Sequence, residues 1–102
     1  MRVSFEKDQI EISLRIIKSE LKKASWVKSV KVDYYIDSGE ANCDMPTRFL
    51  IVKTRKGKKF EIYLNYYNCR IFCGIVIVGV DKSTIKLLES IFSKYGYMIN
   101  KR

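Results

Sequence analysis

The sequence predicts a single α+β domain over residues 1–102, with a twisted, mainly antiparallel sheet of about five to six strands and two helices on one face. Three observations predict this class. The chain has 102 residues, the length of one domain, and its hydrophobic content of 47% is that of a globular protein. Apolar residues recur with the helical period in two segments. Between and after these segments they recur with the period of a strand.

Apolar residues near the start of the chain predict the first helix. They recur at spacings of four, three, four and three, in the order Ile10, Leu14, Ile17, Leu21 and Ala24. These spacings place all of them on one helical face. Asp8 and Glu11 have the spacing of a capping box, so we expect the helix to begin at Asp8.

A half-buried strand is predicted next, over residues 30–36. Valine, tyrosine and isoleucine at the even positions alternate there with Lys31, Asp33 and Tyr35. Residues 37–47 then contain a glycine, the single proline of the chain and three acidic residues, which is typical of a loop.

A β-hairpin is predicted from two apolar runs, 49–52 and 60–64, which flank a basic turn containing Gly57. Two registers are open at this point. A two-residue turn pairs Ile51 with Ile62, whereas a three-residue turn with a glycine bulge shifts the pairing by one residue.

The rest of the chain predicts a second strand–helix–strand unit. Residues 71–78 are apolar on both faces, which is typical of a central strand. Asp81 is the expected cap of a second helix, and Gly96 is its expected end. Residues 97–100 predict a short closing strand.

An internal similarity suggests that the domain has two related halves. Residues 14–27 align without gaps on residues 85–98, with apolar residues on apolar residues and two identical polar positions. Amphipathic helices followed by strands also match in this way by chance, so a true repeat and a chance match both remain open. The repeat predicts similar strand–helix–strand halves at about 1–55 and 56–102, related to the ferredoxin-like arrangement, with a groove between them.

The residue types argue against an enzyme or a metal centre. The chain has no histidine, which removes the commonest general base. Its three cysteines, Cys43, Cys69 and Cys73, are fewer than the four Cys or His ligands of a structural zinc site. We therefore expect no enzyme activity, no cofactor and no metal. Buried free thiols are the expectation for the cysteines, with one disulfide left open.

Charge provides the first functional hypothesis. The net charge is +9, and residues 48–59 carry six basic side chains and no acidic one. These are Arg48, Lys53, Arg55, Lys56, Lys58 and Lys59. Such a hairpin can follow a phosphate backbone, which makes nucleic-acid binding the alternative function. The structural interpretation is a charged turn that keeps a hairpin soluble and blocks edge-to-edge pairing.

Tyrosines provide the leading hypothesis. Tyr35, Tyr63 and Tyr67 are expected to point away from the helices, and tyrosine is a frequent anchor of protein interfaces. We therefore expect a non-enzymatic module that binds a protein or an extended peptide, in the groove between the halves or at a sheet edge. The expected state is a monomer or a homodimer. Exposed tyrosines without a binding role are also common.

The composition carries one resemblance. With no histidine, one glutamine, one proline and heavy use of lysine, isoleucine and tyrosine, the chain resembles the small orphan proteins of archaeal filamentous viruses. This resemblance covers the whole chain and transfers no site residue. It implies a viral protein in the cytoplasm of a hyperthermophilic archaeal host. An intracellular, non-membrane protein is also expected because the sequence shows no signal segment and no long apolar run.

Overall fold

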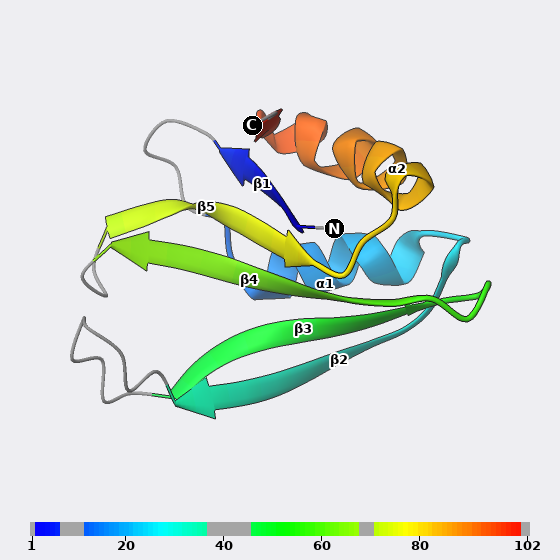
Figure 1. Ribbon diagram of the computed structural model, residues 1–102, viewed down its shortest axis with the longest axis horizontal. Coiled ribbons are helices and arrows are strands. Elements are labelled where there is room, and N and C mark those ends of the chain that lie inside the picture. The colour runs from blue at the N-terminus through cyan, green and yellow to red at the C-terminus, as the bar shows by residue number, and fades with distance from the viewer. Residues whose placement is uncertain (1, 7–11, 37–45, 68–70, 101–102) are drawn as a thin grey trace.

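The structure is a computed structural model that describes residues 2–6, 12–36, 46–67 and 71–100 (Figure 1). Six strands, two α-helices and one short 3₁₀ helix follow one another along this part of the chain. They are β1 (Arg2–Glu6), α1 (Leu14–Lys23), β2 (Val27–Ile36), β3 (Pro46–Thr54), β4 (Lys59–Tyr67), β5 (Ile71–Val78), α2 (Lys82–Phe92), the 3₁₀ helix η1 (Ser93–Tyr95) and β6 (Met98–Asn100).

The strands form one open sheet of six strands in the order β2-β3-β4-β5-β1-β6. Every neighbouring pair is antiparallel. Both described helices contribute their buried residues to one core against the same face of this sheet (Figure 1). The predicted α+β class, with an antiparallel sheet and two helices on one face, is therefore confirmed.

The order of the strands makes the two strand–helix–strand units interlock. Strand β1 pairs on one side with β5 and on the other with β6. Consequently β5 and β6 run parallel to each other, and α2 crosses over β1 to connect them, which is a split βαβ unit. The first unit, β1-α1-β2, likewise connects two strands that run parallel to each other. Strand β5 and the β3–β4 hairpin lie between these two strands. The halves are thus interleaved rather than side by side.

Two pairs of aligned positions in the helices have matching burial. Ile17 and Leu88 are both completely buried, whereas Ile16 and Leu87 are 37% and 41% exposed. The alignment also places the first residue of β2 on the first residue of β6, but Val27 is buried whereas Met98 is 75% exposed. The similarity therefore includes the buried and exposed sides of the two helices, and it does not include the start of the strands that follow them.

Helix α1 begins later than the sequence predicts, so the expected start at Asp8 is wrong. Its N-cap is Ser13, whose side chain accepts a hydrogen bond of 3.2 Å from the Ile16 amide. Ile12 before the cap and Ile17 in the first turn are both buried, as in a hydrophobic staple. Burial of this pair against the core fixes where the helix starts. The predicted cap residues and Ile10 lie outside the described residues.

The β3–β4 hairpin uses the second of the two predicted registers. Leu50 pairs with Ile62, one residue away from the two-residue-turn pairing. The Thr54 amide donates to the Lys58 carbonyl over 2.8 Å, which leaves three residues in the turn. The last of these, Gly57, has a φ of +85°, a conformation that residues with a side chain rarely adopt.

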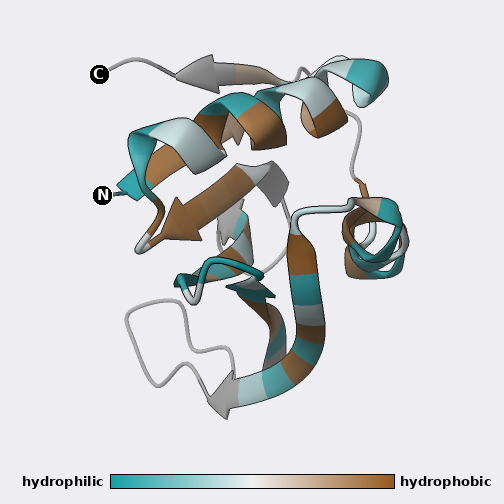
Figure 2. Ribbon diagram, turned by 90° about the vertical axis from the view of Figure 1, so that its right-hand side faces the viewer, coloured by the Kyte–Doolittle hydropathy of each residue, from teal (hydrophilic) through white to brown (hydrophobic). Residues whose placement is uncertain are grey.

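The core lies between the helices and the inner face of the sheet, where Figure 2 shows apolar segments of strand and helix facing each other. At its centre the rings of Phe5 in β1 and Phe92 in α2 lie 4.8 Å apart. Glu20 connects α1 to η1. It accepts a 2.9 Å hydrogen bond from the Tyr95 hydroxyl, and its carboxylate lies 3.3 Å from the Lys94 ammonium. The two halves therefore share one core.

Replacing Phe92 by alanine is expected to lower the free energy of unfolding by about 3–5 kcal/mol, because the change leaves a cavity beside Phe5. Leu87→Ala on the exposed side of the same helix is the matched control, with an expected change within about 0.5 kcal/mol. Urea unfolding followed by circular dichroism measures both. Equal losses in the two variants would contradict the assignment of the core.

Candidate functional site

The basic hairpin does not gather all of its predicted residues at one place. Five of the six side chains are exposed together around the β3–β4 turn. These are Lys53, Arg55, Lys56, Lys58 and Lys59. Arg48 lies toward the other end of β3, where its guanidinium carbon is 5.8 Å from the centre of the Tyr34 ring. Arg48 is therefore not part of the cluster at the turn.

Arg55 attaches the turn to the connection between α1 and β2. Its backbone amide donates to the Trp26 carbonyl over 3.0 Å, and its side-chain Nε donates to the Ser25 carbonyl over 2.8 Å. Within the turn, Thr54 Oγ1 accepts a 3.1 Å hydrogen bond from the Lys58 amide. These bonds hold the tip of the hairpin against a second element, so Arg55 has a structural role.

Asp81 is the N-cap of α2, as predicted, and it also faces the turn. Its Oδ1 accepts hydrogen bonds from the Thr84 amide at 2.8 Å and the Ser83 hydroxyl at 3.1 Å. Its Oδ2 lies 4.0 Å from the Lys58 ammonium. The hydrogen bonds from Thr84, followed by that from Ser83 and the charge of Lys58, lower the pKa of Asp81 to about 2. Asp81 is therefore ionised at any pH near neutrality.

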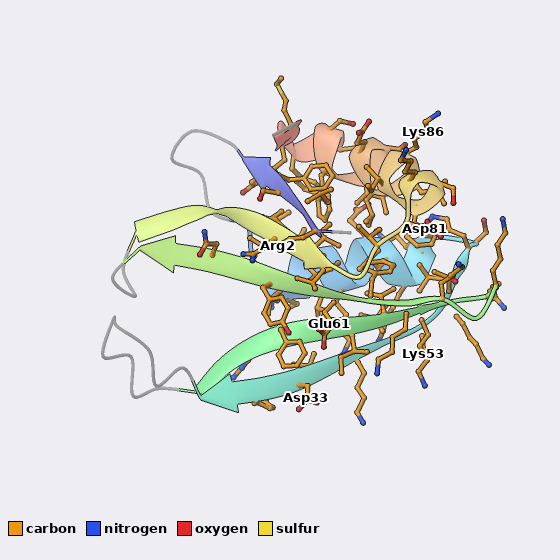
Figure 3. All side chains as sticks on the ribbon, in the orientation of Figure 1. Arg2, Asp33, Lys53, Glu61, Asp81 and Lys86 are labelled. Carbon is orange, nitrogen blue, oxygen red and sulfur yellow. The ribbon has the colours of Figure 1, made fainter. Side chains whose placement is uncertain are left out.

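Three connections of the chain meet at this end of the sheet, and each brings exposed lysines. They are the connections α1–β2, β3–β4 and β5–α2 (Figure 1). We call the resulting cluster the basic end; it consists of Lys22, Lys23, Lys28, Lys53, Arg55, Lys56, Lys58, Lys59 and Lys82. Figure 3 labels Lys53, which points out from the sheet near the hairpin, and Asp81 at the start of α2. Sequence reasoning missed four of these lysines because only the strand order brings their segments together.

The predicted tyrosines do not form one described surface. Tyr63 lies on the sheet face opposite the helices, where its ring stacks on Phe49 with centroids 4.8 Å apart. Its hydroxyl donates to Glu61 Oε1 over 3.1 Å. Tyr35 lies in β2 and Tyr67 in β4, but their side chains fall outside the described part of the structure. Tyr34, which was not predicted as a site residue, is 57% exposed on β2.

Strand β2 forms one edge of the sheet over its whole length of 10 residues. The opposite edge, β6, has 3 residues. On β2 the Tyr34 amide donates to Asp33 Oδ1 over 2.8 Å, so this amide bonds to a side chain. We call the side of β2 that faces away from β3 the free edge.

The described residues offer neither a metal cluster nor a membrane-spanning helix. No group of three or more His, Cys, Asp or Glu side chains in that part of the chain is placed to hold a metal ion. None of its helices is long and apolar enough to cross a membrane. Cys43, Cys69, the side chain of Cys73 and the acidic residues between β2 and β3 lie outside this part.

Asp81→Ala is expected to lower the melting temperature at pH 7, because the variant loses the cap of α2. The pKa of Asp81 falls from 3.8 to about 2 on folding, so its ionised form stabilises the folded state above pH 4. This contribution is lost as the pH falls from about 4 to about 2. The difference between the melting temperatures of wild type and variant should therefore narrow over this range. A difference that is constant from pH 7 to pH 2 would contradict the assigned role.

Comparison with known proteins adds no relative. No family model matches the chain, and no match was found among the curated proteins or the solved structures. The resemblance to small proteins of archaeal filamentous viruses therefore stays a prediction.

Proposed function

We propose that the protein is a non-enzymatic protein-binding module that adds a strand of its partner along the free edge of β2. The observation that carries the proposal is the place of β2, a strand of 10 residues with a neighbour on one side. Among the described residues no strand pairs with its other side, and an unpaired edge of this kind is the basis of strand addition. The lack of histidine in the sequence supports a binding role over a catalytic one.

The hydrogen bonds of the hairpin indicate which backbone groups lie on the free edge. The Thr54 amide bonds to Lys58 across the β3–β4 turn, so alternation along β3 directs residue 53 toward β2. Residue 53 pairs with Ser29, and the odd-numbered residues of β2 then face β3. The N–H and C=O groups of Val30, Val32 and Tyr34 consequently point outward. The bond of the Tyr34 amide to its neighbouring side chain agrees with this assignment.

The partner strand that suits this edge best is β2 of a second copy. In an antiparallel pairing centred on Val32, that residue faces its own equivalent. Lys31 then faces the partner subunit's Asp33, and Tyr34 faces the partner subunit's Val30. Each of the two pairs occurs twice by symmetry, so the edge is self-complementary in charge and in hydrophobicity.

The energies of these cross-strand pairs favour the pairing of β2 with β2 of a second copy. Oppositely charged and aromatic–aliphatic cross-strand pairs each contribute about 0.2–1 kcal/mol, and like charges directly opposite are destabilising. Pairing would also cover the exposed Tyr34 ring. The cost is the hydrogen bond between Asp33 and the Tyr34 amide, which would be exchanged for a backbone hydrogen bond and an ion pair. A lysine at a sheet edge normally blocks strand addition. In the proposed pairing, however, Lys31 faces the carboxylate of the partner subunit's Asp33.

Reversing the two charges of β2 tests this proposal. Lys31→Glu and Asp33→Lys each place like charges opposite each other twice, so each should weaken the dimer about tenfold or more. The double variant Lys31→Asp with Asp33→Lys restores opposite charges and should restore the wild-type dissociation constant. Sedimentation velocity over a range of concentrations measures the dimer in all four proteins.

Lys53→Glu is the matched control, because it changes the charge equally on β3, away from the edge. This variant should dimerise like the wild type. A wild-type protein that stays monomeric at millimolar concentration, or a double variant no better than the single ones, would contradict the proposed pairing.

A further inference from the structure

We infer that the basic end binds the phosphate backbone of double-stranded DNA. The inference rests on residues 22–28, 53–60 and 79–83, which lie at one end of the molecule. Every lysine and arginine side chain in these three segments is exposed, and Asp81 is their single acidic residue. Apart from Lys28, which lies near the start of β2, this site lies away from the free edge, and it does not depend on the proposed strand addition.

The three segments hold one another in place. Arg55 bonds to the carbonyls of Ser25 and Trp26, and the Lys58 ammonium faces Asp81. The end of β5 passes close to the start of β4 at Gly79, where an added Cβ would lie 3.6 Å from the Lys59 carbonyl. The φ of Gly79 is +83°, so a side chain would be strained there. The cations therefore stand on a preformed scaffold, which lowers the entropy lost on binding.

The charges of the basic end act together on a polyanion. At physiological ionic strength the screening length is about 8 Å, so lysines on neighbouring strands and turns add to one local potential. Lys53 and Lys59 form a directly opposed pair of like charges across β3 and β4. Such a pair destabilises the hairpin unless an anion lies near it. The ionised carboxylate of Asp81 lies 4.0 Å from the Lys58 ammonium, so it offsets the charge of one of the nine cations and leaves the basic end strongly positive.

The neighbouring residues favour a duplex over a single strand. Proteins that bind single-stranded nucleic acid combine a basic groove with exposed aromatic rings on which the bases stack. The aromatic side chain in residues 22–28, Trp26, stacks on the buried Phe60 with centroids 6.4 Å apart. Phe60 therefore belongs to the core, and Trp26 is partly buried against it. These segments expose cations and no aromatic ring. This combination is suited to binding the phosphates of a duplex.

The shape of the hairpin favours DNA over RNA and over a membrane surface. A two-stranded ribbon fits the wide major groove of B-form DNA, whereas the major groove of A-form RNA is deep and narrow. Peripheral membrane binding adds an apolar or aromatic anchor to the basic residues. In the three segments of the basic end, the large apolar side chains are partly or fully buried.

Fluorescence anisotropy with a labelled duplex of about 20 base pairs tests the inference. Wild-type protein should bind, and the logarithm of its association constant should fall linearly with the logarithm of salt concentration. A triple variant should weaken binding at least tenfold at low salt. It combines Lys53→Gln, Lys56→Gln and Lys59→Gln. The triple variant should also reduce the salt slope by about 0.9 for each phosphate that it no longer neutralises.

The matched control combines Arg15→Gln, Lys18→Gln and Arg48→Gln, which removes the same charge from α1 and from the other part of β3. This control should retain the wild-type affinity. An equal loss in both triple variants would show a general effect of net charge and would overturn the site.

Three competing ligands complete the experiment. The same sequence as a single strand, an RNA duplex and vesicles containing phosphatidylserine should each bind at least tenfold more weakly than the DNA duplex. A preference for any of them, or a salt slope near zero, would overturn the assignment to double-stranded DNA.

Discussion

The pairing of β1 with both β5 and β6 is the constraint on which the rest of the structure depends. Phe5 lies opposite Ile75 on one side and opposite Ile99 on the other. Its side chain is completely buried and meets Phe92 of α2. In the described sheet β6 pairs with β1 alone, so β1 places both this strand and the helix that leads to it. A contact between distant parts of the sequence thus completes the second half of the domain.

Both proposed surfaces follow from this topology. Because β1 occupies the place beside β5, the first strand–helix–strand unit must reach across the sheet, and β2 becomes a long edge strand. The same alternation of strand directions brings the α1–β2, β3–β4 and β5–α2 connections to one end. Lysines that are dispersed in the sequence consequently form the basic end. The self-complementary edge and the cationic end are therefore separate consequences of one strand order.

The sequence predicts local features well because local chemistry specifies them. Period-two alternation identifies β2, an unbroken apolar run identifies β5, and Asp81 identifies the start of α2. The predicted start of α1 is wrong because the described helix has Ser13 as its cap, with Ile12 and Ile17 buried on either side of it. Strand order depends on contacts that no local pattern carries. The lysines contributed by α1, β2 and α2 to the basic end were therefore beyond prediction, as was the exposure of Tyr34.

Native-state hydrogen exchange of β1 tests the central claim most directly. Ser4 and Phe5 pair with residues of both neighbouring strands, so their amides lie inside the sheet. If β1 completes the domain, these amides should exchange through global unfolding, with the same opening free energy as the Ile75 and Ile77 amides of β5. Exchange of the β1 amides through a local opening of much lower free energy, with β5 still protected, would contradict the account.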